Sequence, residues 1–313
     1  MLNKVRDKLA LHVLRKIYGA RYDFSCSFYG RDRTSTSEVD DSTSIGIVFQ
    51  GPIIDVEKLK EGLTHYRRLL PASTIAISTW EGAIHSDLRS FARHLGVSCV
   101  ESSPPLVGGI MNVNRQIVST SNGINSLLIE SSPELILKAR TDYFPWRPDK
   151  AIRQKQTFTR LLGGRDRIWG IDLNTRLDLP FSFSDIFQLG SAESMKTYWC
   201  GDTLYPNDIS VEQFFKLTRH QQDTAEVLRL QPAEIFLARR YLIRRGATFD
   251  FHSSNDYKRA LAEWFGILDS QHIELAFGKY SLAVPGYEPM PPTDKRKYYV
   301  KNQDWLAMVA EII

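Results

Sequence analysis

"LILKARTDYF", residues 135–144, is an aliphatic run that ends in charge. Its first three residues suit a strand buried in a sheet, as apolar runs of this length often do. Lys138, Arg140 and Asp142 follow directly, although charged side chains are costly to bury without partners. The stretch therefore predicts a strand whose end opens on a polar site.

Similar apolar runs come before this one and alternate with segments of helical periodicity. Strands are expected at residues 44–51, 73–80, 97–103 and 134–144, and helices at 55–70, 85–96 and 111–132. Four strands alternating with helices in about 100 residues predict an α/β fold of Rossmann type, a mostly parallel sheet flanked by helices on both faces.

Local signals mark the ends of these helices. Asp55 is expected to cap the first helix, and Gly96 to end the second. Gly123 lies inside the third helical segment, where we expect it to interrupt the helix.

Ligands of such sheets bind at the carboxyl ends of the parallel strands. That rule brings four segments around one crevice: residues 50–52, 78–80, 101–103 and 138–142. The crevice is therefore expected to contain the charged end of the quoted stretch.

Composition narrows the class of protein. The chain has 313 residues, of which 42% are hydrophobic and 24% charged, so a sizeable core is expected. Three scattered cysteines favour a reducing compartment. The net charge of +4 is concentrated before residue 22, which argues against a nucleic-acid-binding surface.

The first 21 residues resemble a basic amphipathic helix. They carry six cations and one carboxylate, with apolar residues at helical spacing, a pattern typical of helices on anionic membranes. A surface helix docked on its own domain remains the alternative. Since no apolar run is long enough to span a bilayer or to act as a signal peptide, we expect a cytoplasmic protein, peripheral on an anionic membrane surface.

The second half is less regular in sequence. A helix is expected at 232–246 and a strand at 247–254, and the last 35 residues are expected to form a tail on the surface.

Common enzyme motifs are absent. The chain has no G-x-G-x-x-G, P-loop, G-x-S-x-G or H-E-x-x-H sequence, which disfavours dinucleotide dehydrogenases, P-loop enzymes, α/β-hydrolases and zincins. A carboxylate beside cations at a strand end instead suits a diphosphate with Mg²⁺ or Mn²⁺, because these ions take carboxylate and phosphate oxygens. The alternative is a simple Arg140–Asp142 ion pair.

Four motifs together resemble one bacterial family. "IVFQGPI" (47–53), "AISTWEG" (76–82), "NVNRQIVSTSNGI" (112–124) and "LKARTD" (137–142) occur in the order found in WavE-type lipopolysaccharide-synthesis glycosyltransferases, which look like GT-A enzymes. The resemblance covers about residues 44–255. It implies an enzyme that moves a hexose from a nucleotide-sugar, with UDP as the expected nucleotide, to a glycan acceptor of lipopolysaccharide, O-antigen or capsule.

The resemblance also implies an organisation of the chain. Residues 1–43 would be the basic helix and linker, 44–146 the nucleotide-sugar-binding half, and 147–313 an irregular acceptor-binding half with the tail. We expect these segments to form one integrated domain.

Donor-binding residues follow by position in the motifs. The resemblance implies contacts to the nucleotide, diphosphate or sugar from Gln50, Gly51, Pro52, Thr79, Trp80, Asn114, Arg115, Gln116, Lys138, Arg140 and Thr141. Arg115 is the expected oxyanion partner on the third helix, because its guanidinium binds oxyanions bidentately.

The resemblance puts Arg140-Thr141-Asp142 in the place of the GT-A Asp-x-Asp motif, with Arg140 where the first Asp would stand. Two solutions are open. Asp142 holds Mn²⁺ or Mg²⁺ with help from a distant ligand, for which His252 is the candidate. Alternatively, the enzyme needs no metal and relies on Arg140 and Lys138.

An inverting transferase needs a carboxylate to accept the proton of the attacking hydroxyl. Asp185 lies in an apolar run, where a carboxylate needs a partner or a role. Glu234 follows a proline at a helix start, which suits either catalysis or ordinary helix stabilisation. We rank these two equally as catalytic candidates and Glu212 below them. A retaining enzyme would need no such base.

Two other functions stay open. A degenerate transferase that only binds a glycan or nucleotide would explain the missing aspartate. A sugar nucleotidyltransferase has a related sheet, but it would need a Gly-rich basic loop where this chain has Gln50-Gly51-Pro52.

Overall fold

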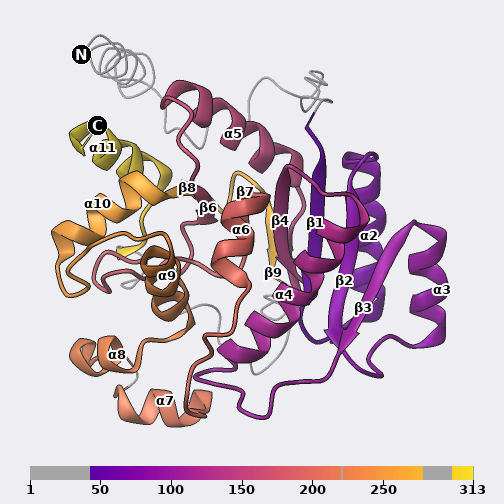
Figure 1. Ribbon diagram of the computed structural model, residues 1–313, viewed down its shortest axis with the longest axis horizontal. Coiled ribbons are helices and arrows are strands. Elements are labelled where there is room, and N and C mark those ends of the chain that lie inside the picture. Colours follow the sequence, from indigo (N-terminus) through magenta and orange to yellow (C-terminus); the bar gives the residue numbers. More distant parts are fainter. Residues whose placement is uncertain (1–42, 220, 278–297, 313) are drawn as a thin grey trace.

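The computed structural model describes residues 43–219, 221–277 and 298–312. A seven-stranded sheet in the order β3-β2-β1-β4-β7-β6-β8 runs through this part of the chain (Figure 1). Its strands are β1 (Ile45–Gln50), β2 (Thr74–Trp80), β3 (Val97–Ser102), β4 (Leu135–Arg140), β6 (Ile168–Ile171), β7 (Gln188–Ser191) and β8 (Phe265–Leu268). Strands β1 to β4 are mutually parallel, and β7 is antiparallel to both neighbours. The predicted α/β class with a mostly parallel sheet is confirmed.

The later half of the chain extends the same sheet, since β6, β7 and β8 all follow residue 147. A separate ladder pairs β5 (Tyr143–Pro145) with β9 (Leu275–Phe277). The described helices are α2 (Val56–Leu69), α3 (Ser86–His94), α4 (Val113–Glu130), α5 (Pro148–Leu161), α6 (Ala192–Trp199), α7 (Val211–Leu217), α8 (Thr224–Leu230), α9 (Ala233–Arg244), α10 (Ser254–Trp264) and α11 (Asn302–Ile312).

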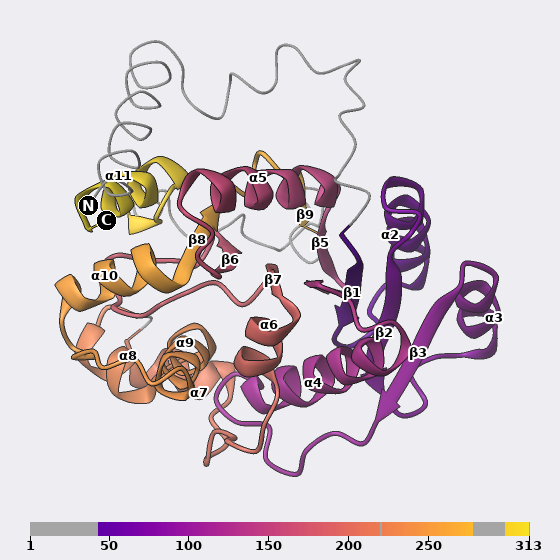
Figure 2. The same ribbon diagram turned by 45° about the horizontal axis from the view of Figure 1, so that its top comes forward.

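Helices cover both faces of the sheet. On one face Phe49 packs edge-on against Tyr66 of α2 and against Phe144. On the other face α4 lies over β1 and β2, and α6 lies beside α4. Figure 2 shows α5 on the side of α2, with the sheet between it and α4 and α6. Successive residues of β1 thus serve opposite helical layers, as the alternation of a strand requires.

The cap predicted for the first helix is confirmed. The carboxylate of Asp55 accepts a hydrogen bond from the backbone N–H of Lys58, at 3.0 Å. Gly96 follows the second helix with a φ of +63°, a left-handed conformation that glycine adopts without steric cost.

The interruption predicted at Gly123 is wrong, because α4 continues through it from Val113 to Glu130. A Cβ at this position would lie 2.5 Å from Cγ1 of Val48 and 3.0 Å from Cβ of Ser78. The glycine therefore allows α4 to approach β1 and β2 closely.

The strand predicted at 247–254 is also wrong. The backbone there forms a turn, in which the Asp250 carboxylate accepts from the N–H of His252 at 2.9 Å. The Asp256 carboxylate accepts from the N–H of Asp250 at 2.7 Å. These side-chain acceptors take backbone donors that a strand would pair with its neighbour.

The prediction that the last 35 residues form a tail on the surface is wrong for α11. Trp305 is completely buried, and its indole N–H donates to the carbonyls of Leu261 and Phe265. Its ring meets Phe158 and Trp169 edge-on. The end of the described chain thus belongs to the core, because an aromatic this large stabilises the fold most when it is buried.

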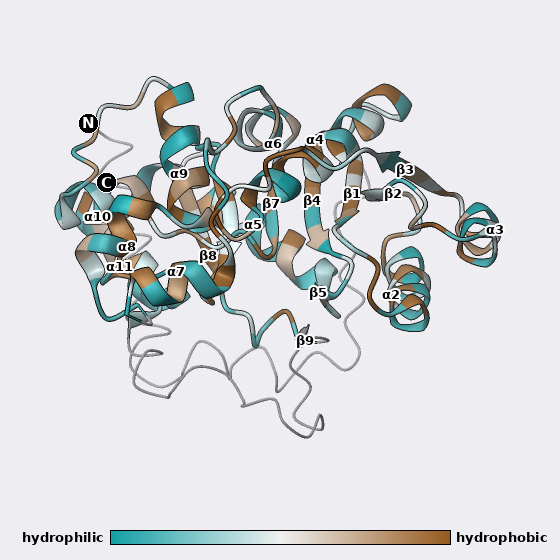
Figure 3. Ribbon diagram, turned by 90° about the horizontal axis from the view of Figure 1, so that it is seen from below, coloured by the Kyte–Doolittle hydropathy of each residue, from teal (hydrophilic) through white to brown (hydrophobic). Residues whose placement is uncertain are grey.

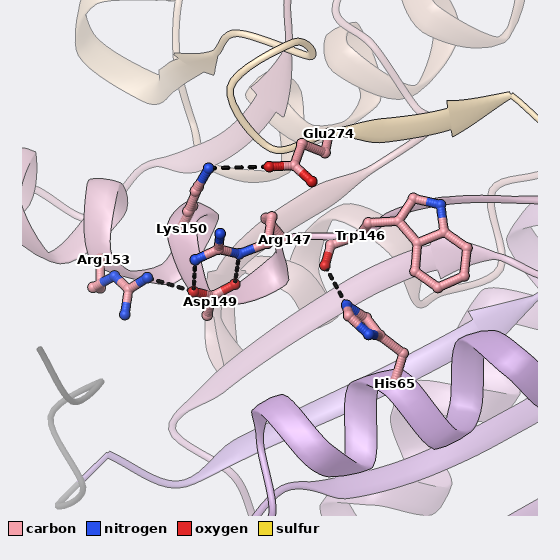
Figure 4. A network of polar contacts seen from close by, with 7 residues as sticks. All are labelled: His65, Trp146, Arg147, Asp149, Lys150, Arg153 and Glu274. Carbon is pink, nitrogen blue, oxygen red and sulfur yellow. Dashed lines mark hydrogen bonds and ion pairs between the residues drawn. The ribbon is translucent and has the colours of Figure 1, made fainter. Parts of the chain in front are cut away.

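A charged network joins α2, α5 and the segment before β9 (Figure 4). Arg147 and Asp149 form a bidentate ion pair, and Arg153 also contacts Asp149. The ammonium of Lys150 lies 3.2 Å from Oε1 of Glu274. On α2, Nε2 of His65 is 2.6 Å from the carbonyl of Trp146. We call this group of seven residues the α5 network.

None of the helices in the described ranges has the length and apolar character needed to cross a bilayer. The basic helix expected within residues 1–21 lies outside the described residues.

Candidate functional site

The carboxyl ends of β1 and β4 meet as predicted. Gln50 stands opposite Arg140 in the parallel register. The N–H of Thr141 donates to the Gln50 carbonyl at 3.0 Å, and its hydroxyl donates to the Pro52 carbonyl at 2.7 Å. Gly51 between them has a φ of +118°, which only glycine adopts readily. Residues 50–52 and 140–142 therefore form one rigid strand-end unit.

Arg140 and Asp142 form a bidentate ion pair in this unit. Nε of Arg140 donates to Oδ1 of Asp142 at 2.8 Å, and Nη2 donates to Oδ2 at 2.9 Å. The arginine side chain is 25% exposed and the aspartate 7%. Burial lowers the pKa of Arg140, but the hydrogen bonds and negative charge of Asp142 outweigh burial and leave this pKa raised.

Lys138 does not reach the surface. It is completely buried on the α6 side of the sheet, where its ammonium lies 4.7 Å above the indole of Trp199. The ammonium donates to the backbone carbonyl of Asp185. Burial is the main cause that lowers the pKa of Lys138 to about 7. Figure 3 shows β4 turning from hydrophobic to hydrophilic along its length.

Asp185 and Glu234 come together although 49 positions separate them in sequence. Asp185 is 5% exposed, and its carboxylate has no hydrogen-bond partner within the described chain. Glu234 is half-buried at the start of α9, and Nδ2 of Asn174 donates to its Oε1 at 3.0 Å. Burial, followed by the negative charge of Asp185, raises the pKa of Glu234 to about 7.

Electrostatic interactions connect the charged end of β4 with Asp185 and, through Asp185, with Glu234. Asp185 interacts electrostatically with Lys138 and Arg140 on β4 and with Glu234 on α9. The strand end expected to bind a donor therefore lies near Asp185, and Asp185 in turn interacts with Glu234, the other residue expected to activate an acceptor. A carboxyl group whose pKa lies near 7 suits proton transfer at neutral pH.

The other predicted donor residues lie around the ends of β1 and β2 and the start of α4. Oε1 of Gln50 accepts from the hydroxyl of Ser119 at 2.8 Å. Thr79 is completely buried, with its hydroxyl unpaired in the described part, and Trp80 is half-buried. Arg115 is exposed at the start of α4, and Gln116 beside it is half-buried.

Asn114 is engaged with backbone instead. Its side-chain amide donates to the carbonyls of Val107 and Tyr205, at 3.0 and 2.8 Å. Its Oδ1 accepts from the N–H of Tyr205 at 2.7 Å. Asn114 thus ties the loop after β3 to the loop after α6 at this end of the sheet.

The residues do not fit a tightly held divalent metal. Both carboxylate oxygens of Asp142 already accept from Arg140. His252 is exposed in the turn before α10. Throughout residues 43–219, 221–277 and 298–312 there is no group of three His, Cys, Asp or Glu side chains placed to bind a metal. Glu212, the lowest-ranked base, is exposed on α7.

Sequence reasoning missed three residues of the site. Asn174, with a φ of +66°, orients Glu234. Arg176 lowers the pKa of Glu234 by its positive charge. Trp199 covers Lys138. None belongs to a motif, so nothing short of the tertiary contacts marks them.

Residues 45–283 match the family described as WavE lipopolysaccharide synthesis. The chain belongs to that family. The match covers most of the sequence and includes every candidate site residue, and it assigns this WavE family member to lipopolysaccharide synthesis.

Solved structures that are similar to this chain share little sequence with it. Glucosyl-3-phosphoglycerate synthase from Mycobacterium tuberculosis, in complex with Mn²⁺, UDP and glucosyl-3-phosphoglycerate, is 11% identical with a TM-score of 0.34, over 67% of this chain and 82% of that one. A mannosyltransferase from Pyrobaculum calidifontis, in complex with GDP-Man and Mn²⁺, is 8% identical with a TM-score of 0.35, over 83% and 90%.

A cytidylyltransferase from Leptospira borgpetersenii is 12% identical with a TM-score of 0.33, over 51% of this chain. The chain spans only 65% of that protein. Comparison with curated proteins gives no match.

Proposed function

We propose that this WavE family member is a glycosyltransferase of GT-A-like architecture. It would move a hexose from a nucleotide-sugar, with a UDP-sugar as the first candidate, to a glycan acceptor of lipopolysaccharide, O-antigen or capsule. The observation that carries the proposal is the position of Asp185. Its carbonyl accepts from Lys138 of β4, and its charge interacts with Arg140 at the end of β4 and with Glu234 at the start of α9. Donor chemistry and acceptor chemistry would thereby share one site.

The donor would lie across the ends of β1, β2 and β4. Residues 50–52 would line the nucleotide pocket, with Thr79 and Trp80 beside the base or ribose. Arg140 would bind the diphosphate, because a guanidinium donates to two phosphate oxygens at once. Arg115 is exposed at the start of α4 and is a second candidate for oxyanion contact.

Glu234 would act as the general base of an inverting reaction. As the acceptor hydroxyl oxygen forms its bond to the anomeric carbon, the hydroxyl proton would pass to the Glu234 carboxylate, and the bond from that carbon to the nucleoside diphosphate would break. Glu234 is more exposed than Asp185, and its pKa of about 7 keeps much of it ionised yet basic at neutral pH. Asp185 would keep this pKa high through its own charge.

The test is transfer from a panel of nucleotide-sugars to lipopolysaccharide acceptors. Glu234→Gln is expected to lower kcat by about 100-fold or more, as loss of a general base does. Asp185→Asn should shift the pH dependence, because it removes the charge that raises the pKa of Glu234. The matched control is Glu212→Gln on α7, which should keep wild-type kcat. Equal kcat for all three variants would contradict the assignment.

The same assay separates the alternatives. Release of pyrophosphate from a nucleoside triphosphate and a sugar phosphate would identify a nucleotidyltransferase. Binding of nucleotide-sugars without transfer to any acceptor would indicate a degenerate, non-catalytic protein.

We also propose peripheral attachment to the inner face of the inner membrane through residues 1–21. The support is their basic, amphipathic sequence, since each well-placed cation contributes about 1 kcal/mol to binding at an anionic surface. Flotation with anionic liposomes should weaken when residues 1–22 are removed. Equal flotation of both chains would remove the membrane role.

A further inference from the structure

We propose that Arg140, held in place by Asp142, supplies the positive charge that neutralises the donor diphosphate, so that donor binding needs no divalent metal. Asp142 is then a positioning residue for the guanidinium rather than a metal ligand. This inference rests on the proposed transferase function.

The first support is the state of the Asp142 carboxylate. Each of its oxygens accepts a charge-assisted hydrogen bond from Arg140, at 2.8 and 2.9 Å. A divalent ion bound there would have to displace a paired cation from a side chain that is only 7% exposed, and breaking such a buried pair is costly. The pair and the ion therefore exclude each other.

The second support is the remaining capacity of Arg140. A guanidinium has five N–H donors, and Asp142 takes two of them. No other hydrogen bond to Arg140 occurs in the described part of the chain, and its side chain is 25% exposed. The remaining N–H groups of the guanidinium are thus available to an oxyanion, while the bonds to Asp142 hold the guanidinium in place. Because the guanidinium is already oriented, less entropy is lost when a phosphate binds.

The third support is that neither Lys138 nor His252 is placed to neutralise the donor diphosphate or to hold a metal for it. Lys138 is completely buried and donates to the Asp185 carbonyl. His252, the proposed distant metal ligand, is exposed in a turn whose nearby carboxylates, Asp250 and Asp256, accept from backbone N–H groups. Of the charged groups at the end of β4, Arg140 alone combines partial exposure with open donors.

The experiment measures binding of UDP, GDP, CDP and inorganic pyrophosphate to the full chain by calorimetry, once with chelator and once with Mn²⁺. For the nucleotide that binds best, the two dissociation constants are expected to agree within about twofold. Arg140→Ala should weaken binding by roughly tenfold to a hundredfold in both conditions, as loss of a charge-assisted bidentate contact does. Asp142→Asn should weaken binding by less and leave it independent of Mn²⁺.

The matched control is Arg147→Ala, which breaks the equivalent pair of the α5 network and should leave nucleotide affinity unchanged. Binding that requires Mn²⁺, and that Asp142→Asn abolishes, would overturn the inference while leaving the transferase proposal intact. Failure of every nucleotide to bind in both conditions would contradict the transferase proposal itself, and this inference with it.

Discussion

Two Arg-x-Asp pairs lie seven residues apart, and they look alike in isolation. Arg147 contacts Asp149 through the same two nitrogens as Arg140 contacts Asp142, at 2.9 and 2.8 Å, and the two aspartates are equally buried. Their surroundings differ. Asp149 is shared with Arg153 in the first turns of α5, whereas the Arg140 pair ends a parallel strand beside Asp185.

The difference shows that the pairing motif does not determine the role. Asp149 receives two arginines and belongs to a network that joins α2, α5 and Glu274 (Figure 4). The Arg140 fork keeps open donors at the edge of the sheet where parallel strands place ligands. One pair therefore serves the fold, and we assign the other to the donor.

The largest expected effect separates the two arginines by activity. Arg140→Ala should lower kcat/KM for transfer by about a hundredfold to a thousandfold, because removing a preorganised contact to the leaving diphosphate destabilises the transition state. Arg147→Ala should change it by less than about threefold. Steady-state kinetics of both variants provides the check, and similar losses in both would erase the functional distinction.

The second effect separates the two aspartates by stability. Asp149→Ala should lower the free energy of unfolding by about 3 kcal/mol, since it leaves two half-buried arginines without their shared partner. Nucleotide affinity should survive in this variant. Urea denaturation measures the change, and a loss below about 0.5 kcal/mol would place the α5 network among ordinary surface ion pairs.

The third effect is a difference in how the contributions of Asp149 and Glu234 to the free energy of unfolding depend on pH. Burial would raise the pKa of Asp149, but the hydrogen bond from Arg147 and the arginine charges lower it below the ordinary 3.8. Its contribution to stability is therefore present above about pH 4 and is lost as the pH falls through the lower folded value. Glu234 behaves in the opposite way, since its pKa rises from 4.5 to about 7 and its contribution disappears as the pH rises through that window.

Glu234→Gln should accordingly stabilise the protein at pH 8 by about 1–3 kcal/mol while it abolishes most activity. Thermal unfolding at pH 5 and pH 8 tests this, with little change expected at pH 5. A variant less stable than wild type at pH 8 would mean that Glu234 is held mainly by favourable contacts.

The smallest effect concerns a third pair, Arg176–Asp178, whose arginine interacts electrostatically with Glu234. The charge of Arg176 lowers the pKa of Glu234, so Arg176→Gln should move the midpoint of the pH–rate profile to higher pH. A midpoint that stays in place, in a variant shown to be folded, would place Arg176 outside the electrostatic surroundings of the base.

Much of the fold could be predicted because its signals are local. The aliphatic runs at 44–51 and 73–80 became β1 and β2 within one residue of the expected bounds, and Asp55 capped α2 as its position suggested. The interruption predicted at Gly123 was wrong because the glycine is explained by the close approach of Val48, on a strand 75 residues away. Propensity describes the helix alone, whereas close packing between elements decides such positions.

The site was predictable only in part, for the same reason. The sequence by itself determined the strand that ends in Arg140 and Asp142, and the edge of the sheet where they lie. Only the tertiary structure decided that Lys138 turns inward under Trp199, and that Glu234 acquires a pKa near 7. Burial and neighbouring charge set these properties, and both come from residues brought together across 45 or more positions of the chain.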